Sequence, residues 1–335
     1  MRIKCRIICM LLVLLPVLLA AGCGKKAEAE LFCMDTVVRL TVHGRNAEAA
    51  LAACTDELYA MERLFSVTEA GSDAARINQA DGAPVWVSPD TQALLQTAQT
   101  VSAETDGAFD VTVYPLVTAW GFLGGAQRVP AQETIRDLLP LVGMERLTLT
   151  DGTVTAEAGT RVDLGGIAKG YASARLAEVA KGYGVSSALF TLGGNVQALG
   201  SRPDGSAWRV GVMDPADPSA VVGVLAVRDR AVITAGGYQR YFVEDGVTYH
   251  HILDPHTGYP ADSDILSVTV VAEDGAAADA LSTALFVLGE EAAIARYRAL
   301  GSFEMVLVKR DHSVLYTAGL DFSAAAGVGA ERIAP

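Results

Sequence analysis

The sequence predicts an α+β fold, in which helices pack on a largely antiparallel or mixed β-sheet. Apolar residues make up 51% of the 335 residues, which is enough to bury a sizeable core. Helical segments are interspersed with strands that are mostly joined by hairpin turns, and this order favours α+β. No repeat of fixed period and no internal linker rich in Pro, Gly or Ser divides the chain, so a single domain over residues 31–325 is expected.

The N-terminus has the pattern of a secretory signal. Three basic residues, Arg2, Lys4 and Arg6, precede an apolar run over residues 7–21. A basic start, a short apolar run and small residues at its end are typical of signal peptides. The run is about fifteen residues long and contains a proline, so it is short for a helix that spans a membrane.

The stretch LLAAGCGKK around Cys23 resembles a bacterial lipobox, in which the peptide is cut before a cysteine that then carries lipid. Ala20 stands where leucine is usual, and a plain signal peptide with an incidental cysteine is the alternative. The resemblance implies a lipoprotein signal peptide over residues 1–22, lipidation at Cys23 and a polar tether over residues 23–30. Several lipid chains give a firm anchor, so the protein is expected on the extracytoplasmic face of the bacterial cell membrane.

The charge balance excludes nucleic acid as a partner. The chain has 26 Lys and Arg against 39 Asp and Glu, which gives a formal net charge of −13 at pH 7. An acidic surface repels phosphate backbones, and no basic cluster along the sequence offsets this repulsion.

Two cysteines, Cys33 and Cys54, follow the expected lipidation site. They could form a disulfide in an oxidising compartment, but the sequence does not give their geometry and leaves the pairing open. There is no CxxC pattern that would indicate a metal site.

The first elements follow from local signals. Residues 36–43 (TVVRLTVH) are rich in β-branched side chains and predict a strand. Residues 46–66 have helical spacing behind Asn46, which is a plausible N-cap.

A second helix and a hairpin come next. Residues 88–107 have helical spacing, with Ser88 or Asp90 as the cap and Gly107 as the end. Residues 146–164 predict a β-hairpin that turns at an Asp-Gly pair.

The second half begins with a helix and continues mainly as strands. Residues 167–184 predict a helix that is entered through Gly165-Gly166 and stops near Gly182. Runs of strands and turns follow over residues 186–200, 207–215, 221–237 and 238–255. A buried strand, two helices and a final hairpin are predicted over residues 265–273, 275–289, 290–300, 303–310 and 313–319.

The stretch VDLGGIAKGYA, residues 162–172, offers features of an anion site. Asp163 ends a strand, two glycines turn the chain, and a helix begins. A helix N-terminus behind glycine favours anions, and Lys169 adds a charge suited to phosphate. A capped helix with a surface lysine is the alternative. No G-x-G-x-x-G or G-x-x-x-x-G-K-[ST] motif supports a dinucleotide fold or a P-loop.

The stretch ADALST places Asp279, Ser282 and Thr283 on one face of a predicted helix. One carboxylate and two hydroxyls form the kind of hard-oxygen set that Mg²⁺ accepts together with phosphate and water. Alternatively, Asp279 offsets the helix dipole and the hydroxyls bond back to helix carbonyls. Taken alone, the stretch favours this second interpretation.

An aromatic residue beside small residues marks the stretch TDGAFDVTVYPL. Phe109 stands between Ala108 and Asp110, and together they could frame a planar ring. A helix end followed by a core strand explains the same residues equally well.

The stretch HHILDPHTGYP contains three of the five histidines of the chain: His250, His251 and His256. Catalytic zinc needs three protein ligands, and adjacent histidines in a strand point to opposite faces, which disfavours a zinc site. The Asp-Pro and Thr-Gly pairs predict a turn. An ordinary turn and a loop that donates one histidine for proton transfer both remain open.

Taken in order, these motifs resemble the FAD:protein FMN transferases, the ApbE-type flavin transferases. The likeness covers residues 31–320, nearly the whole chain behind the signal. No single motif is specific, and the eight together in order carry the resemblance. They are MDT, FS with RIN, DGAFDVTVYPLVTAWGF, VDLGGIAKGYA, LGGN, DGSAWRVGVMDP, YHHILDPHTGYP and SVTVVAEDGAAADALSTALFVLG.

The resemblance implies a T-fold-like architecture and a specific reaction. Members bind FAD and Mg²⁺, cleave the pyrophosphate and move FMN onto a Thr or Ser hydroxyl of a target flavoprotein, leaving AMP. The expected targets are subunits of extracytoplasmic electron-transport systems.

The resemblance also assigns roles by position. The residues expected to contact FAD are Met34, Ala108, Phe109, Asp110, Asp163, Lys169 and Leu253. Those expected to hold Mg²⁺ are Gly166, through its carbonyl, Asp279, Ser282 and Thr283. His251 is the candidate base that helps to deprotonate the attacking hydroxyl, and His250 is expected to be a bystander.

One position departs from the family pattern. The family often has an aromatic two residues after the serine of FS, where this chain has Thr68. A stacking contact worth about 1 kcal/mol is therefore expected to be missing. The acceptor signal Asp-x-x-Thr/Ser-Gly-Ala-Thr/Ser does not occur in the chain, which argues against self-flavinylation.

Two alternatives use the same residues differently. A metal-dependent FAD pyrophosphatase would use water in place of the target hydroxyl and release FMN and AMP. A carrier lipoprotein would only bind flavin, and it would not need the oxygen ligands of residues 279–283.

Overall fold

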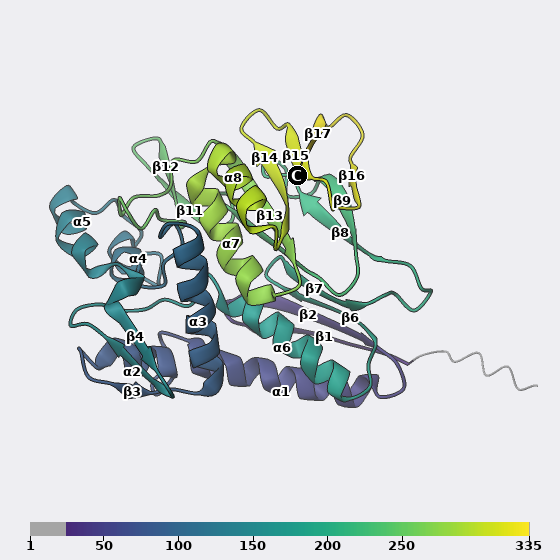
Figure 1. The fold of residues 1–335 in the computed structure, drawn as a ribbon, viewed down its shortest axis with the longest axis horizontal. Helices are drawn as coiled ribbons and strands as arrows, with labels where there is room; N and C mark the ends of the chain where they lie inside the picture. Colours follow the sequence, from purple (N-terminus) through teal and green to yellow (C-terminus); the bar gives the residue numbers. More distant parts are fainter. Residues whose placement is uncertain (1–24, 335) are drawn as a thin grey trace, which may run out of the picture.

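A nine-stranded sheet lies at the centre of the structure, a computed structural model that describes residues 25–334 (Figure 1). All neighbouring strands are antiparallel except β15 and β17, which are parallel. This confirms the α+β fold with a largely antiparallel sheet. In spatial order the strands are β1 (Lys26–Cys33), β2 (Thr36–His43), β6 (Ser187–Leu192), β7 (Asn195–Gly200), β10 (Ala231–Gly236), β13 (Ile265–Ala272), β14 (Glu304–Lys309), β15 (Val314–Thr317) and β17 (Ala330–Ile333).

Three helices, α1 (Ala47–Phe65), α6 (Ala168–Gly182) and α7 (Gly275–Leu288), pack on one face of this sheet (Figure 1). Buried residues of α1 recur at spacings of three or four, as in Leu58, Met61 and Phe65, and form an apolar stripe. Each large aliphatic side chain buried in this way contributes about 1.5–3 kcal/mol.

A small sheet of β8 (Trp208–Met213), β9 (Val221–Val227) and β16 (Phe322–Ala324) covers the other face. The alternation along β14 shows the two faces, because side chains of a strand point to opposite sides in turn. Met305 and Leu307 belong to the core under the helices, whereas Val306 and Val308 belong to the core under the small sheet.

The remaining elements lie around the central sheet and its helices, and Trp120 is buried among those next to the turn after residue 250. The Trp120 ring lies 5.4 Å from the Tyr249 ring, and its indole N–H donates to the Gly258 carbonyl at 2.9 Å. These contacts fix the turn after residue 250. The elements are α2 (Asp73–Gln79), β3 (Val85–Trp86), α3 (Pro89–Glu104), α4 (Tyr114–Trp120), α5 (Gln132–Leu138), β4 (Leu147–Thr150), β5 (Thr153–Ala156), β11 (Tyr241–Glu244), β12 (Val247–His250), α8 (Glu290–Leu300) and two short 3₁₀ turns, Leu139–Leu141 and Met144–Arg146.

The helix starts agree with the predicted caps, except that the Asn46 side chain makes no capping hydrogen bond. The Ser88 hydroxyl accepts from the Thr91 N–H at 3.1 Å and caps α3 as expected. Asn46 stands at the N-cap of α1, but its side chain makes no capping bond. Its amide instead donates to the Tyr183 carbonyl at 2.9 Å and ties α1 to the end of α6.

The structured domain is wider than residues 31–325 at both ends. Residues 26–30, expected in the tether, form most of β1, where small residues alternate with charged ones that pair across to β2. At the other end β17 adds a parallel edge strand beside β15. The expected signal peptide and Cys23 lie outside the described residues, and no helix within 25–334 is long and apolar enough to cross a membrane.

Cys33 and Cys54 are not paired with each other. Both are buried and free, and their thiols face the carbonyls of Leu58 and Leu176 at 3.9 and 3.4 Å. Burial raises the pKa of each thiol to about 12, so neither is a reactive thiolate at neutral pH.

Candidate active site

A cavity of about 1040 Å³, the main cavity, opens between the β1–β2 turn, the N-terminus of α6, the middle of α7 and the loop after β12. Its volume is at the upper end of the range for cofactor and small-molecule sites. Its lining includes every residue that the sequence analysis assigned to catalysis, flavin or metal: Met34, Ala108, Phe109, Asp110, Asp163, Gly166, Lys169, His251, Leu253, Asp279, Ser282 and Thr283.

The β1–β2 turn brings Met34 to the main cavity. Cys33 pairs with Thr36, so Met34 and Asp35 form a two-residue turn, and both have positive φ, 53° and 56°. Such φ values suit the twist of a hairpin, but in residues other than Gly they cost about 1–3 kcal/mol in strained cases. The Glu62 carboxylate accepts from the Met34 N–H at 2.7 Å and holds the turn in place.

The turn into α6 carries the only lysine that lines the main cavity. Lys169 donates to the Gly165 carbonyl at 3.0 Å, one helical turn back. Asp163 accepts from the Gly165 N–H at 2.9 Å, and burial raises the pKa of this carboxyl. The turn therefore presents a cation at a helix N-terminus, where anions are favoured.

Asp279 is held at the crossing of α6 and α7. Its carboxylate accepts from the Gly170 N–H at 2.8 Å and from the Asn195 amide at 3.0 Å. A Cβ on Gly170 would lie 2.1 Å from the Gly275 carbonyl oxygen, so only glycine permits this close approach of the two helices. Burial raises the pKa of Asp279, and this effect exceeds the opposing effects of the Lys169 charge and the two hydrogen bonds.

The oxygens around Asp279 fit a magnesium ion. Ser282 donates to the Asp279 carbonyl at 2.8 Å, as the purely structural interpretation expected, yet Ser282 and Thr283 also line the main cavity. A Cβ built on Gly166 would lie 4.0 Å from the Thr283 hydroxyl, so these two residues are neighbours. The set offers hard oxygen ligands and a buried carboxylate without a cationic contact, as Mg²⁺ sites do. No group of three or more His, Cys, Asp or Glu within 25–334 suggests a different metal.

The segment around Phe109 is irregular, so the alternative of a core strand is wrong. Phe109 is buried beside Gly166, where a Cβ would lie 3.1 Å from the ring. Asp110 accepts from the Thr112 N–H and hydroxyl at 2.7 and 2.6 Å, which stabilises the segment without strand pairing. The Asp163 N–H donates to the Val111 carbonyl at 2.7 Å and joins this segment to the turn before α6.

The three neighbouring histidines lie in different places. His251 lines the main cavity, His250 packs its ring on Phe286, and His256 bonds to Asp254 at the turn. The turn itself is confirmed by the bond from the Gly258 N–H to the Asp254 carbonyl at 2.8 Å. A zinc site shared by the histidines is therefore excluded by geometry.

His251 is poised as a neutral imidazole. Its backbone N–H and its Nδ1 both contact the Arg240 carbonyl, at 3.0 and 3.1 Å. Because a carbonyl can only accept, Nδ1 carries the proton and Nε2 keeps a free lone pair. Burial, together with the nearby charge of Arg240, lowers the pKa of His251 to about 4, so the ring is uncharged at neutral pH.

Three residues of the site were not predicted from the sequence. Arg240 lines the main cavity and bonds to Asp35 at 2.7 Å across its mouth, while Asn195 and Glu62 hold Asp279 and Met34. The only feature of the sequence that could have marked Asn195 as a site residue is its place in the LGGN stretch. The partners of Arg240 and Glu62 are far away in sequence, so no local pattern could reveal them.

The main cavity has groups that a phosphorylated nucleotide could use. Two cations, Lys169 and Arg240, line it together with five carboxylates, a neutral histidine and the hydroxyls of Ser282 and Thr283. Comparison with known proteins agrees with this interpretation. Residues 34–307 match the model of the ApbE family, and the chain belongs to that family.

Curated relatives carry one activity name. The FAD:protein FMN transferase of Klebsiella pneumoniae (strain 342) is 37% identical over 76% of this chain and 80% of its own length. That of Treponema pallidum (strain Nichols) is 33% identical over 92% of this chain and 93% of its own length. Among solved structures, the ApbE protein of Thermotoga maritima superposes with a TM-score of 0.81 at 36% identity, covering 87% of this chain and 96% of that one.

Proposed function

We propose that this protein transfers FMN from FAD to a Thr or Ser hydroxyl of a target flavoprotein, with Mg²⁺, and releases AMP. Transfer of FMN from FAD to a protein is the activity named for the curated relatives, and it is the activity of this chain. The finer points rest on one observation. Lys169, His251 and the pair Asp279 and Thr283 come from three distant parts of the sequence and line a single cavity beside a glycine-lined helix N-terminus.

The reaction exchanges one phosphorus–oxygen bond for another. The acceptor hydroxyl oxygen forms a bond to the phosphorus of the FMN half, and the bond from that phosphorus to the bridging oxygen of AMP breaks. The bond electrons leave with AMP, and the hydroxyl proton goes to a base. The positive charges of Lys169 and Arg240 offset the pyrophosphate charge, which electrostatic stabilisation of this reaction requires.

His251 is the base in this scheme. The Arg240 carbonyl holds Nδ1–H, so Nε2 is available to take the hydroxyl proton. Threonine and serine hydroxyls are weak nucleophiles without such help. Asp279, Ser282, Thr283 and the Gly166 carbonyl are the groups that would hold Mg²⁺, which supplies charge neutralisation on the phosphates.

We further propose that the protein works outside the cytoplasm, anchored by lipid at Cys23. The support is the lipobox-like stretch of the sequence, behind whose cysteine the first strand begins at Lys26. Subunits of extracytoplasmic electron-transport systems are the proposed targets.

The proposal is tested by following FAD with and without Mg²⁺, by chromatography of the products. AMP formation that needs both Mg²⁺ and an acceptor protein is expected. AMP and free FMN in equal amounts without an acceptor would instead establish a pyrophosphatase. Bound FAD with no product would establish a carrier.

A further inference from the structure

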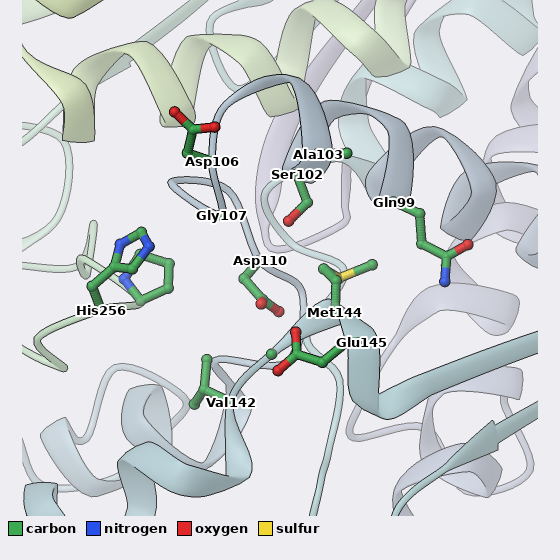
Figure 2. Close-up of a pocket in the computed structure, with 12 residues that line it drawn as sticks. Gln99, Ser102, Ala103, Asp106, Gly107, Asp110, Val142, Met144, Glu145 and His256 are labelled. Carbon is green, nitrogen blue, oxygen red and sulfur yellow. The ribbon is translucent and has the colours of Figure 1, made fainter.

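A second cavity, of about 460 Å³, lies beside the main cavity (Figure 2). The two cavities share Asp110 and Pro255 in their linings. The segment of residues 107–110 separates them: Gly107 lines the second cavity, Ala108 and Phe109 line the main one, and Asp110 lines both. A group bound in the second cavity would therefore lie next to the bound flavin nucleotide.

The second cavity is lined by acids and by neither Lys nor Arg. Its lining residues with a carboxylate are Asp106, Asp110 and Glu145, and His256 also lines it. Asp106 is paired with Arg296, outside the lining. Figure 2 shows the carboxylates of Asp110 and Glu145 directed toward one another. The charge of Glu145 adds to burial in raising the pKa of Asp110, so the two carboxylates repel each other.

The hydroxyl of a buried residue, Ser102, independently marks the same space. Ser102 is only 6% exposed, and its hydroxyl makes no hydrogen bond to any residue within 25–334. Figure 2 shows this hydroxyl directed into the second cavity. The side-chain amide of Gln99 donates to the Leu147 carbonyl, so the side-chain oxygen of Gln99 is available as another acceptor. The Ser102 hydroxyl and the Gln99 oxygen can both accept from a ligand with N–H donors.

We infer that the second cavity binds the cationic side chain, Lys or Arg, of a segment of the acceptor protein. The occupant rests on the proposed function, which requires two substrates at adjoining positions. The main cavity, whose lining includes Lys169 and Arg240 among five carboxylates, offers cations to the negative pyrophosphate of FAD. The second cavity has three carboxylates and no Lys or Arg in its lining, so it offers no cation to that anion and attracts a positive group.

The geometry favours an organic cation over a metal ion. The volume of about 460 Å³ matches sites for small molecules and side chains rather than a coordination sphere. No group of three or more His, Cys, Asp or Glu in the described part of the chain is arranged to hold a metal. A charged side chain paired with Glu145 and hydrogen-bonded to Ser102 uses the acceptors that are present.

The first test is binding without turnover. The probes are Nα-acetyl-lysine methylamide and the uncharged Nα-acetyl-norleucine methylamide, titrated into the purified protein and followed by ligand-observed NMR. We expect saturable binding of the lysine probe alone, about tenfold weaker in Glu145→Gln and weakened also in Ser102→Ala. Glu331→Gln, an exposed glutamate on β17, is the matched control and should bind as the parent does.

Equal binding of both probes, or no effect of Glu145→Gln, would overturn the inference. So would displacement of the lysine probe by Ca²⁺ or Mg²⁺ in the parent but not in Glu145→Gln, which would make this a metal site.

The second test separates this inference from the proposed function. In transfer assays, Glu145→Gln should raise the KM for the acceptor about tenfold and leave the KM for FAD unchanged. A rise in the KM for FAD would contradict the assignment. If the lysine probe binds as expected but no FMN transfer is ever seen, the proposed function fails while the cation site stands.

Discussion

The two neighbouring cavities differ in whether a cation lines them. The main cavity has Lys169, Arg240 and a neutral His251 among five carboxylates, whereas the second cavity has three carboxylates and no Lys or Arg in its lining. One segment, residues 107–110, serves both. The difference teaches that a protein with a net charge of −13 can still offer cations to an anionic substrate at one cavity while its neighbour offers none.

The largest effect on the rate of transfer is expected from a substitution in the oxygen cluster around Asp279. Asp279→Asn keeps the shape and the hydrogen bond to Gly170 but removes the charge that would hold Mg²⁺. Transfer should fall by about a thousandfold, because metal assistance contributes several kcal/mol. Initial rates at several Mg²⁺ concentrations measure this. Full activity of Asp279→Asn would exclude the metal site, and Asp274→Asn, at the N-cap of the same helix, is the control.

The next effect concerns the base. His251→Gln should lower the rate of transfer about 10²- to 10⁴-fold while FAD still binds. Since the pKa of His251 is lowered from 6.5 to about 4, the parent should keep its base down to about pH 4. An acid limb near pH 6.5 in the pH–rate profile would contradict this assignment.

The stability of the fold that is linked to His251 is present above pH 6.5. It is lost as pH falls toward 4, because the unfolded chain takes up the proton first.

A smaller effect tests how the mouth of the main cavity holds the anion. Arg240→Lys keeps a charge but loses the planar fork that reaches Asp35. The KM for FAD should rise about tenfold, and the KM for the acceptor should not change. A rise in both constants would show that the cavities are not independent. Arg39→Lys, a surface pair with Glu30 on β1 and β2, is the control.

The smallest expected effect is a gain in affinity for FAD from a substitution of Thr68. Thr68 lines the main cavity, where many relatives of the chain are expected to have an aromatic residue. Thr68→Tyr should tighten FAD binding about fivefold, the equivalent of about 1 kcal/mol of stacking. Fluorescence titration of FAD measures this. Thr68→Val, which adds no ring, should leave affinity as in the parent, and equal gains for both variants would argue against stacking.

Sequence patterns predicted what is local. Each correctly predicted feature depends only on a few neighbouring residues. These features are the glycine turn before α6, the Ser88 cap and the i, i+3, i+4 cluster of α7. Period-two alternation in β1 was masked by its charged residues, so those residues were assigned to a tether. The edge position of the strand explains those charges.

Long-range partners could not be predicted from local patterns. Arg240 meets Asp35 across 205 positions of the chain, and Ser102 reaches the second cavity only because α3 lies beside the turn at Gly143. Such contacts depend on the tertiary arrangement of elements. The second cavity as a whole was absent from the sequence analysis for this reason.

The most direct measurement is the intact mass of a purified acceptor domain that carries the Asp-x-x-Thr/Ser-Gly-Ala-Thr/Ser signal, after incubation with this protein, FAD and Mg²⁺. The account predicts a gain of one FMN, which is lost when Asp279→Ala replaces the parent or when the signal hydroxyl is removed from the acceptor. An unchanged acceptor mass, with FMN and AMP free in solution, would contradict transfer to protein.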